Sequence, residues 1–395
     1  MKDKHWNFDE LIDRKNTNSS KWDGTDKMFQ KENLLPMWIA DMDFLSPRPI
    51  TEAIINRAEH GVFGYTFLSP EYYKAVINWF QRRYNWTIEK KWIFFTPGVL
   101  PGLSFSVQAF SSPGDKIIVQ NPVYTPFYQI IKNNDRKRLL NPLKLLNGHY
   151  EMDFKDLRAK ARHPRAKLMI LCNPHNPTGR VWTREELTTL GEICIENQIL
   201  VIADEIHCDL VYPGFRFTPF ASISNEFAQN SIICNSPSKT FNIPSLKLAN
   251  VIIPNAQLRT KFSRIRQSHH ITTPNCFVSS VLEAAYNECE EWVDELKVYL
   301  KANLEFLKQF IRENIPEIKV IEPEGTYLVW LDFRGLGFNS KEITKILFDK
   351  AKVALWEGGL FGNGGKGFER INIACPRSIL SEGLNRIVKA IKDFS

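Results

Sequence analysis

The stretch SIICNSPSKTFN, residues 231–242, places Lys239 in a polar loop directly behind an apolar run that is typical of a buried strand. An ammonium group at the mouth of a buried strand loses hydration, which costs free energy unless a partner replaces the water. Most lysines avoid this cost by staying on the surface. Lys239 is therefore either a solvated loop residue or an amine held near the strand end for chemistry.

Near-continuous apolar runs recur through the first two thirds of the chain, with helical patterns such as TREELTTLGEICIENQ (183–198) between several of them. Such runs favour strands that are buried on both faces. Their alternation with helices predicts an α/β fold with a largely parallel sheet flanked by helices. The runs are WIFF (92–95), KIIVQ (116–120), KLMILC (167–172), ILVIADE (199–205), SIICNS (231–236) and NVIIP (250–254).

The pattern changes after residue 280, where a long amphipathic stretch begins and then stops at Pro316, because proline cannot continue a helix. Beyond it we expect a helix near 340–351 and a final helix from about residue 379. Two apolar runs, YLVWLDF (327–333) and VALWEGG (353–359), also lie in this region. We expect an N-terminal segment (1–50) packed on a small α+β domain (288–395), and a large domain (51–287) that carries the ligand.

Composition excludes several classes of protein. The chain has 395 residues, 43% of them hydrophobic and 24% charged, which is ordinary for a globular protein long enough for two domains. The net charge of +7 comes from scattered residues, so we expect no nucleic-acid partner. No apolar stretch approaches the roughly 20 residues of a membrane span, and residues 1–15 lack the apolar core of a secretory signal. We therefore expect no membrane partner.

The 7 cysteines are widely spaced and form no CxxC motif. An odd count at such spacings is typical of reduced thiols that fill small spaces in a core. This cysteine usage predicts a cytoplasmic protein.

Polar loops follow five of the six early runs. Because the carboxyl ends of parallel strands lie at one edge of a sheet, where α/β folds bind ligands, these loops are expected to converge on one crevice that contains Lys239. The loops read TPGVLPGL after WIFF, NPVYTPF after KIIVQ, NPHNPTGR after KLMILC, DEIHCD after LVIA, and NSPSKT after SIIC.

The side chains in these loops suit the parts of one ligand. Asp204 follows apolar residues, so its carboxylate is expected to be buried and to need a cationic partner such as a protonated ring nitrogen. Tyr124 could lie flat on a ring, and Asn176 could donate to a ring oxygen. The amine of Lys239 could form an imine with an aldehyde.

A phosphate would also find partners, provided that a helix begins after the PGV triplet. The candidate hydroxyls and backbone amides are those of Gly98, Val99, Leu100, Ser236 and Ser238. An aromatic ring that carries a nitrogen, a hydroxyl, an aldehyde and a phosphate describes pyridoxal 5′-phosphate (PLP).

Three motifs in this order, NPHNPTG (173–179), DEIHCD (204–209) and SPSK (236–239), resemble those of the fold-type I PLP-dependent enzymes of aminotransferase class I/II. Further stretches, including LPMWIADMDF (35–44) and FERINIACPR (368–377), are similar to the PatB/MalY branch of that superfamily. This branch comprises the cysteine-S-conjugate and cystathionine β-lyases. The resemblance covers most of the chain and implies that residues 51–287 form the PLP-binding domain.

The resemblance implies roles for the loop residues. Lys239 carries the cofactor and transfers protons, while Asp204 pairs with the pyridinium nitrogen and keeps the ring an electron sink. Asn176 donates to the ring 3-oxygen. Tyr124 and Ile206 cover the two faces of the ring.

Further residues are implied to bind the substrate and a second subunit. Arg370 forks onto the substrate α-carboxylate, a geometry that favours arginine over lysine, with Arg377 as the alternative. The substrate also contacts Ile39, Ala40, Tyr124 and Asn176. Tyr65 reaches the phosphate of the neighbouring subunit, so the active unit is a homodimer.

Two positions depart from the pattern of many aminotransferases. His207 stands where many carry tyrosine, and it either contributes beside the ring oxygen or simply packs. Lys247 stands where many relatives carry arginine, and it either contacts the phosphate or is solvated. We expect no metal site, because His207 has no second ligand at a useful spacing. We also expect no dinucleotide site, because no GxGxxG follows an early strand.

The implied activity is a β-lyase that cleaves L-cystathionine or other L-cysteine S-conjugates to a thiol, pyruvate and ammonia. An aminotransferase of class I/II is the alternative, because both reactions share the cofactor and the first proton abstraction. A regulator built on the same fold is disfavoured, since the fold's own motifs begin by residue 35. Aromatic residues that suit an apolar S-substituent are Trp38, Phe63, Phe67 and Phe127.

Overall fold

The structure is a computed structural model that describes residues 6–394. The predicted N-terminal segment and small domain extend to residues 1 and 395, so their outermost ends lie outside the described residues. Of residues 1–15, which show no secretory signal in the sequence, residues 1–5 also lie outside the described residues.

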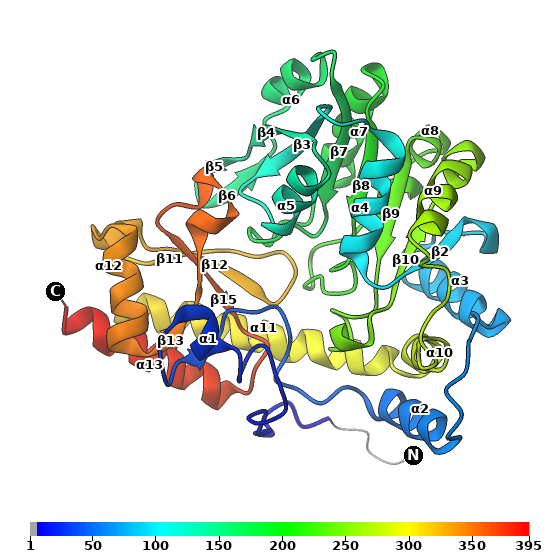
Figure 1. Ribbon diagram of the computed structural model, residues 1–395. Coiled ribbons are helices and arrows are strands. Elements are labelled where there is room, and N and C mark those ends of the chain that lie inside the picture. Colours follow the sequence, from blue (N-terminus) through cyan, green and yellow to red (C-terminus); the bar gives the residue numbers. More distant parts are fainter. Residues whose placement is uncertain (1–5, 395) are drawn as a thin grey trace.

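A seven-stranded sheet forms the centre of the larger part of the molecule (Figure 1). Strand β10 runs antiparallel to both of its neighbours, and the other pairings in the sheet are parallel. The predicted α/β fold with a largely parallel sheet is confirmed. The reversed strand comes from NVIIP (250–254), which is the one of the six apolar runs for which no ligand-binding loop was predicted. In spatial order the strands are β2 (Ile93–Thr96), β10 (Ala249–Ile252), β9 (Ser231–Asn235), β8 (Leu200–Asp204), β7 (Ala166–Cys172), β3 (Lys116–Asn121) and β4 (Lys137–Pro142).

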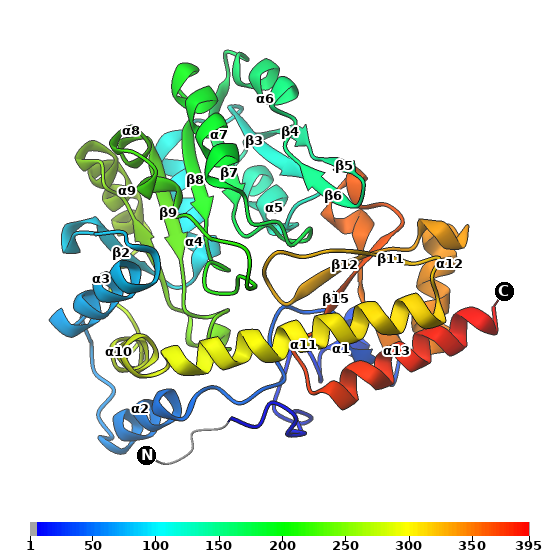
Figure 2. The same ribbon diagram turned by 180° about the vertical axis from the view of Figure 1, so that it is seen from behind.

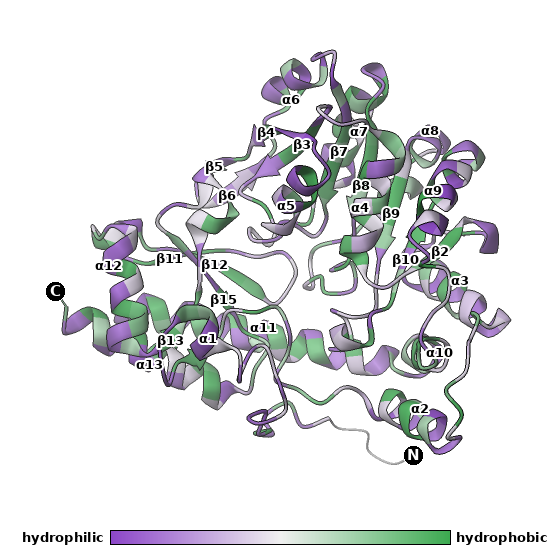
Figure 3. Cartoon of the chain, viewed as in Figure 1, coloured by the Kyte–Doolittle hydropathy of each residue, from purple (hydrophilic) through white to green (hydrophobic). Residues whose placement is uncertain are grey.

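Helices cover both faces of this sheet, as the opposite views in Figures 1 and 2 show. Successive residues of β7 alternate between two cores: Met169 and Leu171 pack on one side, Leu168 and Ile170 on the other. Figure 3 shows the strands mostly hydrophobic and the outer faces of the helices hydrophilic. The flanking helices are α4 (Val99–Phe110), α5 (Pro126–Asn133) and α9 (Ala256–Ser268) on one face, and α6 (Phe154–Ala161), α7 (Arg184–Glu196) and α8 (Asn225–Gln229) on the other.

Local sequence explains where two of these helices begin. Thr183 and Glu186 form both hydrogen bonds of a capping box, which starts the predicted helix at Arg184. Helix α4 starts at Val99, immediately after Gly98, whose φ of 117° is accessible to glycine and strained for other residues. The condition attached to a phosphate site was a helix beginning after PGV, and the helix begins at the last residue of that triplet, Val99.

A smaller antiparallel sheet lies beside the first, and the long helix α11 (Glu290–Asn314) runs along both parts of the molecule (Figure 2). This helix is the predicted amphipathic stretch, and it ends just before Pro316. The predicted helix over 340–351 changes to π-type hydrogen bonding at Ile346, and the final helix begins at Arg377. The elements are β11 (Lys319–Ile321), β12 (Leu328–Asp332), β15 (Phe368–Asn372), β14 (Trp356–Glu357), α12 (Ser340–Lys345) and α13 (Arg377–Lys392). The boundaries 50/51 and 287/288 stay predictions.

Short elements complete the structure. Helices α2, α3 and α10 pack together at the end of the larger part, and β5 and β6 form a hairpin. None of the helices in residues 6–394 combines the length and apolar character that a membrane crossing requires. Six of the seven cysteines are buried, as expected for core residues. The bounds are α1 (Thr25–Phe29), α2 (Arg48–Glu59), α3 (Pro70–Tyr84), α10 (Val278–Glu288), β5 (Lys144–Leu146) and β6 (His149–Glu151).

The N-terminal segment joins the smaller part through β1 (Leu35–Pro36), which pairs in parallel with β13 (Val353–Ala354). Farther along, Asp43 is 3% exposed and accepts hydrogen bonds from Lys21 Nζ at 2.6 Å and Arg14 Nη1 at 2.7 Å. These bonds fix the chain just after residues 38–41.

The Asp43→Ala variant is expected to lower the free energy of unfolding by about 3–5 kcal/mol, because it removes the close carboxylate of the buried Lys21 ammonium and leaves only Asp41 Oδ1 at 3.8 Å. Urea denaturation measures the loss. The matched control is Glu52→Ala, which breaks the exposed Arg48–Glu52 pair and should cost about 0.5 kcal/mol or less. Equal losses in both variants would show that the buried cluster does not stabilise the fold.

Candidate active site

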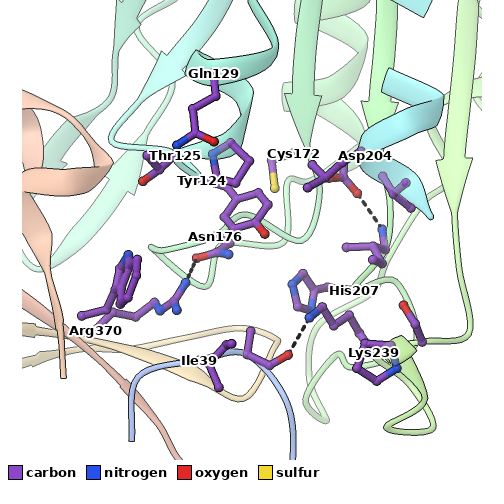
Figure 4. Close-up of a pocket in the computed structure, with 18 of the residues that line it drawn as sticks. Ile39, Tyr124, Thr125, Gln129, Cys172, Asn176, Asp204, His207, Lys239 and Arg370 are labelled. Carbon is purple, nitrogen blue, oxygen red and sulfur yellow. Dashed lines mark hydrogen bonds between the residues drawn. The ribbon is translucent and has the colours of Figure 1, made fainter. Parts of the chain in front are cut away.

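A cavity of about 500 Å³ lies at the carboxyl ends of the parallel strands, where the five polar loops converge (Figure 4). It is closed on the other side by the N-terminal segment and by β15. Most of the predicted site residues line it: Ile39, Ala40, Val99, Leu100, Tyr124, Asn176, Asp204, Ile206, His207, Ser238, Lys239, Lys247 and Arg370.

The amine of Lys239 points into this cavity (Figure 4), and its side chain is half-buried. Its Nζ donates to the carbonyl oxygen of Ala40 at 2.5 Å. Burial lowers the pKa of Lys239 to about 8, and the positive charges of Arg370 and Lys247 act in the same direction, while Asp41 and Asp204 oppose them. A substantial fraction of the amine is therefore neutral near pH 7 to 8, as a nucleophile or base must be.

Asp204 ends β8 and is 3% exposed. Its Oδ1 accepts a hydrogen bond from the backbone nitrogen of Ile206 at 3.1 Å, and no described cationic side chain forms an ion pair with it. Burial raises the pKa of Asp204 to about 7. A cationic ring nitrogen beside this carboxylate would replace the missing partner, so the residue fits the ligand expected from the sequence.

Arg370 projects from β15 into the cavity and meets Asn176 from the opposite side (Figure 4). Its Nη1 donates to Asn176 Oδ1 at 3.0 Å and its Nη2 to the carbonyl oxygen of Trp38 at 2.7 Å. Burial lowers the pKa of Arg370 to about 10, so it stays charged at neutral pH. A buried, charged fork of this kind suits a carboxylate.

The bond from Arg370 occupies the amide oxygen of Asn176 and leaves its amide nitrogen able to donate to a ligand. The alternative carboxylate binder, Arg377, does not line the cavity. It begins α13, and its Nε donates to Asn303 Oδ1 at 2.7 Å. The structure thus brings Arg370, and not Arg377, to the candidate site.

The two positions that depart from the family pattern also line the cavity. Burial lowers the pKa of His207 to about 3, so the ring is neutral, and it packs edge-on against Tyr327. Its Nδ1 is buried and has no hydrogen-bond partner among the described residues. Lys247 is exposed at the rim. The roles of both residues stay predictions.

The residues predicted to bind a phosphate lie around the start of α4. Val99 and Leu100, in the first turn of α4, line the cavity together with Ser238, and the first turn of a helix favours anions. Gly98 and Ser236 lie just behind this edge and do not line the cavity. Ser236 Oγ contacts Ser238 Oγ at 2.8 Å and the carbonyl oxygen of Leu248 at 2.6 Å, which holds the loop in place.

Tyr65 lies away from the cavity of its own chain and is fully exposed. Of the aromatic residues considered for an apolar substituent, Trp38 lines the cavity, whereas Phe127 is fully buried in the core. Phe63 and Phe67 are 60% and 81% exposed.

The sequence did not point to several residues that line the cavity. Trp356 stacks on Trp38 with ring centroids 4.8 Å apart, although the two are far apart in the chain. No local pattern marks Trp356, because only strand pairing in the smaller sheet brings it here. Thr125 and Gln129 follow Tyr124 around the start of α5, where helical spacing could have identified them. Cys172 lies at the carboxyl end of β7.

Comparison with known proteins identifies similar chains. The family model described as aminotransferase class I and II matches residues 35–387. Cystathionine beta-lyase PatB of Bacillus subtilis is 45% identical over 98% of this chain and 100% of its own.

Two similar solved structures each superimpose with a TM-score of 0.96 and contain PLP. A putative aminotransferase from Clostridium difficile has 44% sequence identity and covers 98% of this chain and 100% of its own. Cystalysin from Treponema denticola has 37% identity and covers 99% of this chain and 100% of its own.

Proposed function

The chain belongs to the aminotransferase class I and II family and has the fold of the fold-type I PLP enzymes, and from this premise we propose that it is a PLP-dependent carbon–sulfur β-lyase. Its substrate is L-cystathionine or another L-cysteine S-conjugate, and its products are a thiol, pyruvate and ammonia. The likeness to PatB, which extends over the whole of both chains, confirms the predicted resemblance and carries the choice of a lyase.

The residues of the cavity fit PLP. The cofactor, when bound, supplies an aldehyde for an amine and a ring that accepts electrons. Asp204, buried without an ion-pair partner among the described residues, suits the protonated ring nitrogen. The free amide nitrogen of Asn176 suits the ring 3-oxygen, and Tyr124 and Ile206 provide apolar surface for the ring. The start of α4 and Ser238 suit the phosphate.

Two side chains handle the substrate: the charged Arg370 binds it, and the neutral form of Lys239 removes its proton. Arg370 binds the α-carboxylate through its fork, and Asn176 keeps the guanidinium in position. Lys239 then takes the proton from Cα, which it can do because burial keeps part of its amine neutral. The C–S bond at Cβ breaks, the sulfur leaves as a thiolate, and the remaining enamine hydrolyses to pyruvate and ammonia.

Incubation of the PLP-loaded protein with L-cystathionine, in the absence of any keto acid, tests this proposal. Pyruvate and a new thiol should accumulate in equal amounts. Formation of an amino acid only when a keto acid is supplied would instead identify an aminotransferase, which is the alternative that shares this machinery.

Uptake of PLP by the cofactor-free protein should accelerate about tenfold per pH unit below pH 8 and level off above it. The reason is that only the neutral amine of Lys239 attacks the aldehyde, and its pKa is lowered to about 8. Stopped-flow absorbance measures the rate. Nα-acetyl-lysine with free PLP is the control, and its rate should rise until about pH 10.4. A protein profile that follows the control would show that the buried amine is not the attacking group.

We infer that the active unit is a homodimer in which Tyr65 reaches the partner's phosphate site. Tyr65 stands between Phe63 and Phe67 in the sequence, and all three side chains are exposed, which supports an interface in this segment. The Tyr65→Phe variant is expected to bind PLP about tenfold more weakly, through loss of a hydrogen bond to a charged group. Mixing it with a Lys239→Ala variant should restore one complete site per mixed dimer. Unchanged PLP affinity on mixing would contradict a shared site.

We also place the protein in the cytoplasm, because its buried cysteines suit a reducing compartment. Fractionation of cells, with detection of the protein by antibody, tests this location.

A further inference from the structure

Asp209 is a buried side chain outside the cavity, five residues after Asp204, and the mechanism above does not use it. It is 3% exposed, and three side chains donate hydrogen bonds to it. Thr240 Oγ1 donates to Oδ2 at 2.7 Å, and Trp79 Nε1 donates to Oδ1 at 3.1 Å. The hydroxyl of Tyr84 also donates to Oδ1. These three donors replace the water that the buried carboxyl group has lost, and they fix its position.

The bond between Thr240 and Asp209 joins the two loops that carry the central groups of the site. Strand β8 ends at Asp204, and Asp209 lies in the loop that follows it. Thr240 directly follows Lys239 in the loop after β9. Strands β8 and β9 pair side by side only as far as Asp204 and Cys234. Beyond that point the Thr240 hydroxyl provides a cross-link between the loops after the strands have ended.

The side chains of Lys239 and Thr240 are held from different directions. Lys239 Nζ bonds to Ala40 at the cavity, while Thr240 is fully buried against Asp209. A displacement of Thr240 would therefore move the backbone that supports the reactive amine.

Helix α3 gives this cross-link a rigid base. Trp79, which holds Asp209, stacks on Tyr286 of α10 with ring centroids 4.6 Å apart and an interplanar angle of 7°. Both rings are buried in the core, so Asp209 cannot follow a movement of the loop that carries Thr240.

We propose that Asp209 and Thr240 are positioning residues, whose hydrogen bond sets the separation between the amine of Lys239 and the carboxylate of Asp204. This inference rests on the proposed PLP-dependent activity. The cofactor must reach Lys239 with its aldehyde and Asp204 with its ring nitrogen at once, so that separation decides how the bound ring and the base are aligned.

The test compares Thr240→Val, which has the same shape without the hydroxyl, with Thr240→Ser, which keeps it. The valine variant should lose about tenfold to a hundredfold in kcat with KM changed less than about twofold, because misalignment of the base affects the chemical step more than binding. It should also release PLP faster, as measured by absorbance after dilution. The serine variant should restore both values to within about threefold of the original protein.

Tyr72→Phe is the matched structural control. It removes another buried side-chain hydrogen bond, which Tyr72 donates to Asn250 at 2.6 Å. Tyr72 lies on α3, the helix that also carries Trp79, and does not line the cavity. It should lower Tm as much as Thr240→Val does and leave kcat and PLP release unchanged. Thr240→Ala, assayed in parallel, removes the hydroxyl without a branched replacement in case the valine variant does not fold.

Two failures are distinguishable. An original protein that binds PLP and produces no pyruvate would overturn the lyase, while PLP release by the variants would still test the cross-link. An active original protein whose valine variant keeps its kcat and PLP release, or whose serine and valine variants lose both equally, would overturn the positioning role.

Discussion

The Lys239→Ala variant is expected to lose at least about 10⁴-fold in kcat for pyruvate formation, because one amine both anchors the cofactor and transfers the substrate proton. The environment of Lys239 supports this dual use: its side chain is half-buried, its pKa is lowered to about 8, and its amine, which donates to Ala40, lines the cavity. Borohydride reduction followed by peptide mass spectrometry should find PLP attached to Lys239 in the original protein and none in the variant.

Lys247→Ala is the matched control for this experiment, because Lys247 is the other lysine among the described residues that line the cavity. This variant should retain the covalent adduct and most of its kcat, and should bind PLP more weakly if Lys247 contacts the phosphate. A Lys239→Ala variant that turns over normally, or that retains a trapped adduct at another lysine, would remove the basis of the proposed mechanism.

The Asp204→Asn variant is expected to lose on the order of 10²–10³-fold in kcat, because a neutral amide cannot keep the ring nitrogen protonated when charge develops on the ring. The variant should also change the stability of the cofactor-free protein. Burial raises the pKa of Asp204 to about 7, so its contribution to folding is present at low pH and is lost as pH rises through about 7. An asparagine does not ionise, so the cofactor-free variant does not lose stability in this way. The Tm of the variant minus the Tm of the original protein should therefore increase from pH 5 to pH 8.

Glu205→Gln provides a control with nearly the same burial and a different position. Burial raises the pKa of Glu205 to about 8, yet the residue does not line the cavity, and its Oε1 accepts from the backbone nitrogen of Phe220 at 2.8 Å. This variant should show a similar pH-dependent gain in Tm with kcat nearly unchanged. Equal losses of kcat in both variants would mean that Asp204 acts only through the stability of the sheet edge.

Tertiary contacts decided much of the site that local patterns could not reach. Arg370 was expected to bind a carboxylate, but its bonds to Asn176 and to the carbonyl oxygen of Trp38 join segments far apart in the chain. Trp356 enters the cavity through pairing in the smaller sheet, and no run of neighbouring residues marks it. The antiparallel direction of β10 could not be predicted from the sequence either, because an apolar run is compatible with parallel and antiparallel pairing.

The sequence by itself determined the alternating strands and helices, the convergence of five loops at one sheet edge, and the presence of Lys239 and Asp204 in two of those loops. It could do so because hydrophobic periodicity is local, and because the ends of parallel strands share an edge by geometry. Only the tertiary structure decided which arginine reaches the cavity, how burial shifts the pKa of Lys239 and Asp204, and that Thr240 is tied to Asp209. Burial and long-range hydrogen bonds depend on the packing of distant segments, which no local pattern in the chain encodes.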